Sequence, residues 1–271
     1  LDAAGITASD RALMAFSFGP FIGFWSAFDA ATARGALVIP GGGMTSLARV
    51  EVVEHAKVTA VFSTPSYALR MAEVAAEHRI NLARSCVEKI VVAGEPGGSV
   101  PVMRERIEQA WGATVIDHAG ATEIGPWGFA DAERRGLHIN ESEFIAEFIS
   151  VETGQPAESG EVAHLLLTSL GRLGSPVIRY RTGDLVRPTW PESGPCRFVL
   201  LEGGVLGRAD DMMIIRGVNV YPSAVEQILH SFPEVVEYRL TARRRGALDE
   251  LLVEVEDRLD RPARVAEELQ L

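Results

Sequence analysis

Short apolar runs alternate with amphipathic runs over the first half of the chain, and this alternation constrains the fold more than any other feature. Four apolar runs have the length of buried strands, at 36–40, 60–63, 88–93 and 113–117. The segments between them have helical periodicity, at 47–57, 65–77 and 100–111. Two of these helices carry a proline in the first turn, Pro65 and Pro101. Strands spaced by helices predict a parallel sheet with covered faces.

The second half has a different pattern. Strand-like runs separated by Gly, Pro and Ser turns predict an antiparallel β region, at 161–169, 177–187 and 197–202. After a charged, glycine-rich segment we expect a helix, two strands and the start of a helix, at 223–230, 235–242, 250–256 and 262–269. The fold class is therefore α/β, with mostly parallel sheet layers plus a β region in residues 1–209. A small α+β domain follows in residues 210–271.

One aromatic-rich run needs a membrane test. No charge interrupts residues 12–28, but about 20 apolar residues are needed to span a bilayer. Gly19-Pro20 and Gly23 break the run, and the acidic Asp2 and Asp10 precede it where a signal peptide would be basic. We expect buried aromatic structure here and no membrane partner.

Charge and cysteine content exclude other classes. Lys+Arg 26 against Asp+Glu 37 gives a net charge of −11, so the chain lacks the basic field that non-specific nucleic-acid binding needs. Cys86 and Cys196 cannot build a disulfide framework, and no Cys/His cluster has zinc spacing. We expect both cysteines to be ordinary thiols in a reducing cytoplasm.

The default ligand site of an open parallel sheet lies at the carboxyl ends of its strands. Residues 94–98 follow the third predicted strand and residues 118–128 follow the fourth. Thr122 can hydrogen-bond a phosphate and Glu123 can hold Mg²⁺, although the same string also suits a helix N-cap. Asp184 follows a glycine turn and can accept from both hydroxyls of a ribose, or simply cap the turn.

Three strings in fixed order carry a family resemblance: HAGATE at 118–123, VIRYRTGDLV at 177–186 and GRADDMMIIRGVNVYPSAVE at 207–226. STPSYALRMAE at 63–73 and GLHINESEF at 136–144 match the same group. The sequence resembles the adenylate-forming superfamily of acyl- and aryl-CoA synthetases, within it the phenylacetate–CoA ligase-like group. The resemblance extends from about Ala12 to the end.

The resemblance implies a two-step ligase. ATP would activate an aromatic carboxylic acid to an acyl-adenylate, and the acyl group would then pass to coenzyme A. Two alternatives stay open: loading of a carrier-protein phosphopantetheine, and a nucleotide-binding fragment without turnover. Members of the group often form dimers, so a homodimer is also implied.

The same resemblance assigns residues. Glu123 would coordinate Mg²⁺, Thr122 would hold the α-phosphate, Asp184 would bind the ribose hydroxyls and Arg208 would lie near the ribose or phosphate. The adenine would be lined by Gly94, Glu95, Pro96, Asp117, His118, Ala119 and Gly120. Asp210 matches the hinge of the small domain, and Gly217 matches a loop along the thiol tunnel.

The acid would occupy an aromatic slot formed by Phe16 and Phe21, with Tyr67, Gly94 and Ile124 nearby. A core position is the alternative for both Phe residues, and His118 would contact either a ring substituent or adenine. Phenylacetate, benzoate, an aminobenzoate and a hydroxybenzoate all fit such a slot.

The sequence also departs from the family pattern. Ala119 stands where members carry an aromatic residue, so adenine stacking is expected to be weaker or supplied elsewhere. The family's phosphate loop and late lysine have no counterpart in these residues, and Lys57 and Lys89 lack the matching context. We therefore expect these 271 residues to be incomplete at both ends.

Overall fold

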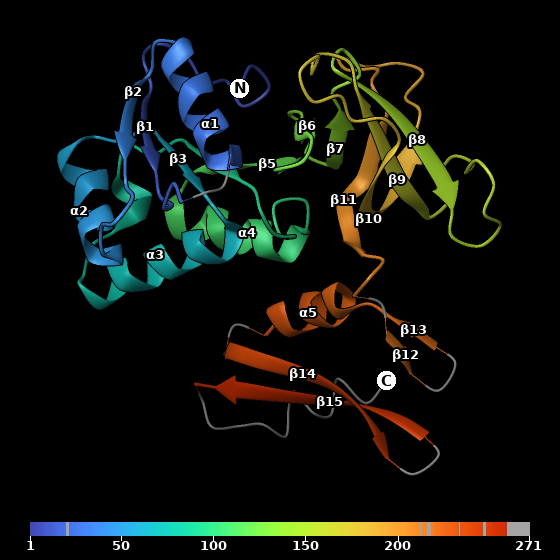
Figure 1. The fold of residues 1–271 in the computed structure, drawn as a ribbon. Helices are drawn as coiled ribbons and strands as arrows, with labels where there is room; N and C mark the ends of the chain where they lie inside the picture. The colour runs from blue at the N-terminus through green and yellow to red at the C-terminus, as the bar shows by residue number, and fades with distance from the viewer. Residues whose placement is uncertain (20–21, 212, 216–217, 233, 246–247, 259–271) are drawn as a thin grey trace.

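The computed structural model describes residues 1–19, 22–211, 213–215, 218–232, 234–245 and 248–258 (Figure 1). The helices are α1 (Ile22–Ala33), α2 (Ser46–His55), α3 (Pro65–Glu77), α4 (Pro101–Trp111) and α5 (Pro222–His230), with a 3₁₀ turn at Leu82–Arg84. The strands are β1 (Arg11–Met14), β2 (Leu37–Pro40), β3 (Ala60–Ser63), β4 (Lys89–Val92), β5 (Thr114–Ala121), β6 (Gly125–Phe129), β7 (Gly136–Ile139), β8 (Phe144–Ser150), β9 (Ala163–Ser169), β10 (Tyr180–Thr189), β11 (Leu200–Arg208), β12 (Met213–Ile215), β13 (Val218–Val220), β14 (Val235–Arg245) and β15 (Leu248–Asp257).

One large sheet organises the fold, with strand order β2-β1-β3-β4-β5-β6-β7-β11-β10-β9-β8. The five strands from β2 to β5 pair in parallel, as the βα alternation predicts. The helix over 65–77 is confirmed as α3, where Thr64 accepts from the backbone N–H of Tyr67 and Pro65 occupies the first turn. An apolar cluster that includes Val61, Ile90 and Trp111 fills the space between the sheet and α2, α3 and α4.

The strand β5 joins the two halves of the sheet. Its first half, Thr114–Asp117, pairs in parallel with β4, and its second half, His118–Ala121, pairs antiparallel with β6. The sequence alone predicts that this strand ends at Asp117. Cross-strand bonding to β6 extends it to Ala121, with a register shift between Ala119 and Gly120. The second half of β5 therefore lies where the sheet changes from parallel to antiparallel.

The aromatic-rich run is only partly buried, which corrects the expectation. It forms β1 and then α1. Phe16 stacks on Phe24 with ring centroids 4.4 Å apart, whereas Trp25 is 45% exposed. Within the part of the chain that the structure describes, no helix combines the length and apolar character needed to cross a membrane.

Several strands depart from the sequence expectations. The sequence predicts a buried strand at β2, but β2 is an edge strand of the sheet and its Leu37 is 48% exposed. β1, β6, β7 and β8 had no predicted counterpart, because they are short or lack apolar–polar alternation.

The C-terminal residues form a small α+β unit below the large sheet (Figure 1). Leu229 and Phe232 pack against partly buried residues of β14 and β15, among them Val253. The predicted helix start at 262–269 lies outside the described residues.

Candidate active site

Two cavities adjoin each other at the carboxyl ends of the parallel strands. We name the first, of about 450 Å³, the charged cavity, because its lining includes Asp117, Glu123, Asp184 and Arg208. We name the second, of about 440 Å³, the aromatic cavity. Its lining includes Phe16, Phe24, Phe62, Ala93 and Thr122. Gly94, His118, Gly120 and Ala121 border both, so a ligand in one cavity can meet a ligand in the other.

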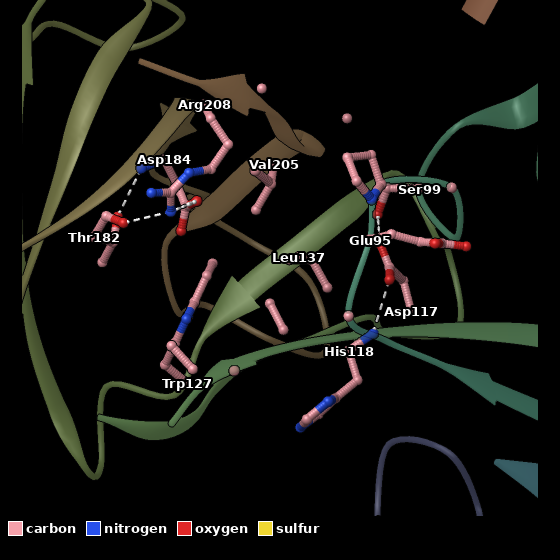
Figure 2. Close-up of a pocket in the computed structure, with 18 of the residues that line it drawn as sticks. Glu95, Ser99, Asp117, His118, Trp127, Leu137, Thr182, Asp184, Val205 and Arg208 are labelled. Carbon is pink, nitrogen blue, oxygen red and sulfur yellow. Dashed lines mark hydrogen bonds and ion pairs between the residues drawn. The ribbon is translucent and has the colours of Figure 1, made fainter. Parts of the chain in front are cut away.

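One end of the charged cavity is built around a buried carboxyl (Figure 2). The Ser99 hydroxyl donates to Asp117 Oδ2, and the backbone N–H of His118 donates to Asp117 Oδ1 at 2.9 Å. Burial raises the pKa of Asp117 to about 6. Burial also lowers the pKa of His118 to about 4, so this imidazole is neutral at pH 7.

The opposite end of the charged cavity holds an ion pair between neighbouring strands (Figure 2). Arg208 Nη1 lies 3.3 Å from Asp184 Oδ1 and donates to the carbonyl of Thr182 at 2.7 Å. Two further guanidinium nitrogens contact both carboxylate oxygens of Asp210, at 3.1 and 3.2 Å. Burial raises the pKa of Asp184, although the charge of Arg208 opposes this effect. Leu137 and Val205 lie between the two ends and offer apolar surface.

Thr122 and Glu123 follow β5 at the junction of the cavities. Thr122 lines the aromatic cavity and Glu123 lines the charged cavity, and both residues are exposed. The Arg172 guanidinium donates to the backbone carbonyl of Glu123, which fixes this turn. Among the described residues, no three His, Cys, Asp or Glu side chains cluster to hold a metal ion. A single carboxylate still fits Mg²⁺, which is commonly bound by one or two carboxylates together with substrate phosphates.

The structure brings most of the predicted site residues together. The charged cavity is lined by Gly94, Glu95, Pro96, Asp117, His118, Ala119, Gly120, Glu123, Asp184 and Arg208. The aromatic cavity is lined by Phe16, Gly94 and Thr122. Glu95 also has a structural task, since its carboxylate accepts from the Ser66 N–H at the start of α3 at 2.6 Å.

Other predicted residues lie elsewhere. Tyr67 lines neither cavity; its hydroxyl hydrogen-bonds Ser46 and its ring lies under the Arg49 guanidinium. Ile124 is 1% exposed and belongs to the core of the antiparallel half. Asp210 pairs with Arg208 at the predicted hinge. Phe21 and Gly217 lie outside the described residues.

Sequence reasoning missed several lining residues. In the charged cavity they include Ser99, Trp127, Leu137, Val205 and Glu226, and in the aromatic cavity Phe24, Phe62 and Val91. Phe24 was visible as part of the aromatic run. The others come from strands, loops and the helix α5, which meet only in three dimensions.

The chain matches known proteins over nearly its full length. A family model described as the AMP-binding enzyme C-terminal domain matches residues 217–270. A phenylacetate–coenzyme A ligase of Thermus thermophilus is 35% identical over 261 residues, covering 94% of this chain and 58% of that protein. A phenylacetate–coenzyme A ligase of Escherichia coli is also 35% identical, over 94% of this chain and 59% of that protein. This chain therefore spans about three fifths of the length of these relatives.

Solved structures of 2-hydroxyisobutyryl-CoA ligase resemble the chain in three dimensions. The form described as the postadenylation state, with a bound adenylate, has a TM-score of 0.88 at 31% identity and covers 98% of this chain and 59% of that one. The same ligase in its thioesterification state, with adenylate and CoA, has a TM-score of 0.73 at 32% identity, over 99% of this chain and 58% of that one.

Proposed function

Because the chain belongs to the phenylacetate–CoA ligase-like group of the adenylate-forming superfamily, we propose that it carries the active site of an aryl acid–CoA ligase. The full protein would convert ATP and an aromatic carboxylic acid into an acyl-adenylate and pyrophosphate, and then form a thioester with coenzyme A. The observation that carries this proposal is the meeting of a charged and an aromatic cavity at Gly94, His118 and Gly120.

The charged cavity suits a nucleotide. Asp117 at one end offers a hydrogen-bond acceptor for adenine, and Asp184 at the other end offers one for the ribose hydroxyls. The apolar side chains of Leu137 and Val205 lie between them and can contact a flat base, as Ala119 offers no aromatic ring. The spacing of these groups supports the sequence assignment of adenine and ribose.

The reacting groups would meet at Thr122 and Glu123. Attack of an acid carboxylate on the α-phosphate brings two anions together, so charge neutralisation and alignment dominate this step. The Thr122 hydroxyl would donate to the α-phosphate, and Arg208 would supply positive charge from across the cavity. Glu123 would hold Mg²⁺, which neutralises phosphate charge when bound.

The aromatic cavity suits the acid. Phe16, Phe24 and Phe62 present apolar ring surfaces, and the neutral imidazole of His118 at the junction can hydrogen-bond a polar substituent of the acid. A flat aryl group would fill this space and direct its carboxylate toward Thr122.

The second step is assigned to movement of the C-terminal unit. We place the boundary between the two domains at Asp210, whose carboxylate binds Arg208 directly after β11. Gly217 would line the thiol path. The chain superposes better on the postadenylation state of 2-hydroxyisobutyryl-CoA ligase than on its thioesterification state. This difference supports a C-terminal unit that changes its position between the two steps.

The test uses the full-length protein with a panel of aryl acids. We expect pyrophosphate release that requires both ATP and an acid, followed by thioester formation on addition of CoA. No pyrophosphate release with any acid of the panel would overturn the ligase proposal. Thioester formation on a holo-carrier protein but not on CoA would overturn the assignment of the acceptor.

A further inference from the structure

In the charged cavity, the buried Ser99 directly contacts the buried carboxyl of Asp117. Ser99 is 7% exposed, and its hydroxyl donates to Oδ2 of Asp117, which is 8% exposed (Figure 2). The backbone of Ser99 also hydrogen-bonds this carboxyl. With the His118 N–H on Oδ1, three donors converge on one buried side chain.

Two glycines leave the space that this arrangement needs. A Cβ atom at Gly98 would lie 2.6 Å from Asp117 Cγ, and one at Gly204 would lie 2.7 Å from Ser99 Oγ. Both contacts are too short for real atoms, so a side chain at either position would displace the serine or the carboxyl. Segments from the loop after β4, from β5 and from β11 therefore enclose this pair.

A carboxylate has about four lone-pair sites, and three donors leave one for a ligand. An amino group on a base is a suitable donor for that site. Adenine presents such a group at its 6-position, whereas guanine presents an acceptor oxygen there. A carboxylate locked as an acceptor would thus favour adenine over a 6-oxo purine.

We propose that Ser99 is a positioning residue for nucleotide selection: its hydroxyl orients Asp117 and keeps that carboxyl an acceptor for the amino group of adenine. This inference rests on the proposed function, and it adds a residue that does not touch the reacting atoms.

The protonation of Asp117 gives the proposal a distinct signature. Burial raises the pKa of Asp117 to about 6, and the Ser99 hydroxyl counteracts that rise. Removing the hydroxyl therefore raises the pKa further, and a protonated Asp117 can donate to a 6-oxo group. The charged or titratable groups near this carboxyl are His118 on β5, Arg104 on α4, Glu95 in the loop after β4 and Glu226 on α5. His118 is already neutral at pH 6, because burial lowers its pKa to about 4.

The experiment measures kcat/KM for ATP and for ITP from pH 5.5 to 8.5 in the full-length protein. We expect Ser99→Ala to shift the acidic limb of the ATP profile to higher pH. At pH 6.5 it should lower kcat/KM for ATP about tenfold and reduce the preference for ATP over ITP by a similar factor, the loss typical of one charge-assisted hydrogen bond. Ser99→Cys, a weaker donor, should shift both quantities in the same direction by less. Asp117→Asn, which does not titrate, should remove the limb.

Ser150→Ala is the matched control. Ser150 is also buried and its hydroxyl also donates to a carboxylate, that of Glu161, but it lies on β8 outside both cavities. We expect this variant to keep the wild-type pH profile and selectivity. A wild-type profile and ATP:ITP ratio in folded Ser99→Ala or Ser99→Cys would overturn the role of Ser99. A wild-type protein without ATP-dependent pyrophosphate release would instead overturn the proposed function.

Discussion

Asp184 and Arg208 are direct cross-strand partners in β10 and β11, and their side chains meet with Nη1 3.3 Å from Oδ1. The guanidinium is held by three oxygen-bearing groups at once, since Asp210 and the Thr182 carbonyl also accept from it. An arginine fixed in this way keeps Asp184 oriented toward the cavity. The pair therefore joins the ribose end of the proposed site to the predicted domain boundary.

Replacing Asp184 with Asn should weaken ATP binding. The amide keeps the shape but loses the charge, and hydrogen bonds to charged groups contribute about 1.5–3 kcal/mol. We expect the KM for ATP to rise roughly 10- to 100-fold, with a smaller preference for ATP over 2′-deoxy-ATP. Steady-state pyrophosphate release measures both quantities. Asp29→Asn, on the exposed surface of α1, serves as control, and an equal effect in the two variants would refute the ribose role.

Replacing Glu123 with Gln should impair magnesium-dependent adenylation. A neutral amide is a poor ligand for Mg²⁺, so we expect kcat to fall at least about 100-fold and the half-saturating Mg²⁺ concentration to rise. Magnesium titrations of pyrophosphate release provide the measurement, with Glu105→Gln on the exposed face of α4 as control. A wild-type magnesium dependence in Glu123→Gln would remove this residue from the metal role.

Most of the parallel half of the fold, apart from β1 and the exposure of β2, could be predicted from the sequence because buried strands and capped helices leave local signals. β3 and α3 have the predicted bounds, and Pro65 marks the start of the helix. β6, β7 and β8 could not be predicted, because they are short or lack apolar–polar alternation and are defined only by their pairing with other strands. The extension of β5 through Ala121 has the same cause, since β6 supplies its hydrogen bonds.

Site residues within or next to short sequence motifs could be predicted, whereas those brought to the cavities by packing mostly could not. Glu123 and Asp184 lie in motifs and Asp117 directly precedes one, and the structure places all three along one cavity. Ser99 and Phe24 have no motif of their own, and only the folded chain brings them to the cavities. Tyr67 lies in a matching string, yet its ring packs under Arg49 instead.

Truncating Phe24 should weaken binding of the acid and leave binding of ATP unchanged. Phe24 lines the aromatic cavity and stacks on Phe16, and an aromatic pair contributes about 0.5–1.5 kcal/mol beyond its buried area. We expect Phe24→Ala to raise the KM for phenylacetate or benzoate about tenfold while the KM for ATP changes less than about twofold. Phe24→Leu retains apolar volume, so its KM for the acid should lie between those of the wild type and Phe24→Ala. Equal changes in both KM values would contradict the assignment of this cavity to the acid.

Stability should depend on Asp10, which lies outside both cavities. Burial alone would raise the pKa of Asp10, but hydrogen bonds from Thr59, Thr7 and Lys89 bring it below the ordinary value. A lowered folded-state pKa means that this stabilisation is present above about pH 4 and is lost as the pH falls through the folded pKa. We expect Asp10→Asn to lower the free energy of unfolding by about 2–3 kcal/mol at pH 7. The difference from wild type should shrink below about pH 4, as followed by urea unfolding. A constant difference at every pH would contradict this account, and Glu51→Gln on the exposed surface is the control.

The last prediction concerns the contact between the C-terminal unit and α3. Arg258, directly after β15, donates to Glu73, which Arg70 also contacts at 3.1 Å. This pairing belongs to the arrangement that agrees better with a postadenylation state than with a thioesterification state.

Exposed ion pairs contribute at most about 1 kcal/mol, so Arg258→Gln should slow the adenylation half-reaction by at most about fivefold and leave the rate of thioester formation from preformed adenylate unchanged. Rapid-quench measurement of each half-reaction in the full-length protein tests this expectation. In the double variant Glu73→Arg/Arg258→Glu the two charges are exchanged. Its loss of adenylation rate should be smaller than the summed losses of the two single variants, and added salt should reduce this difference. An equal loss in both half-reactions would show that the pair stabilises the fold and does not select between the two arrangements.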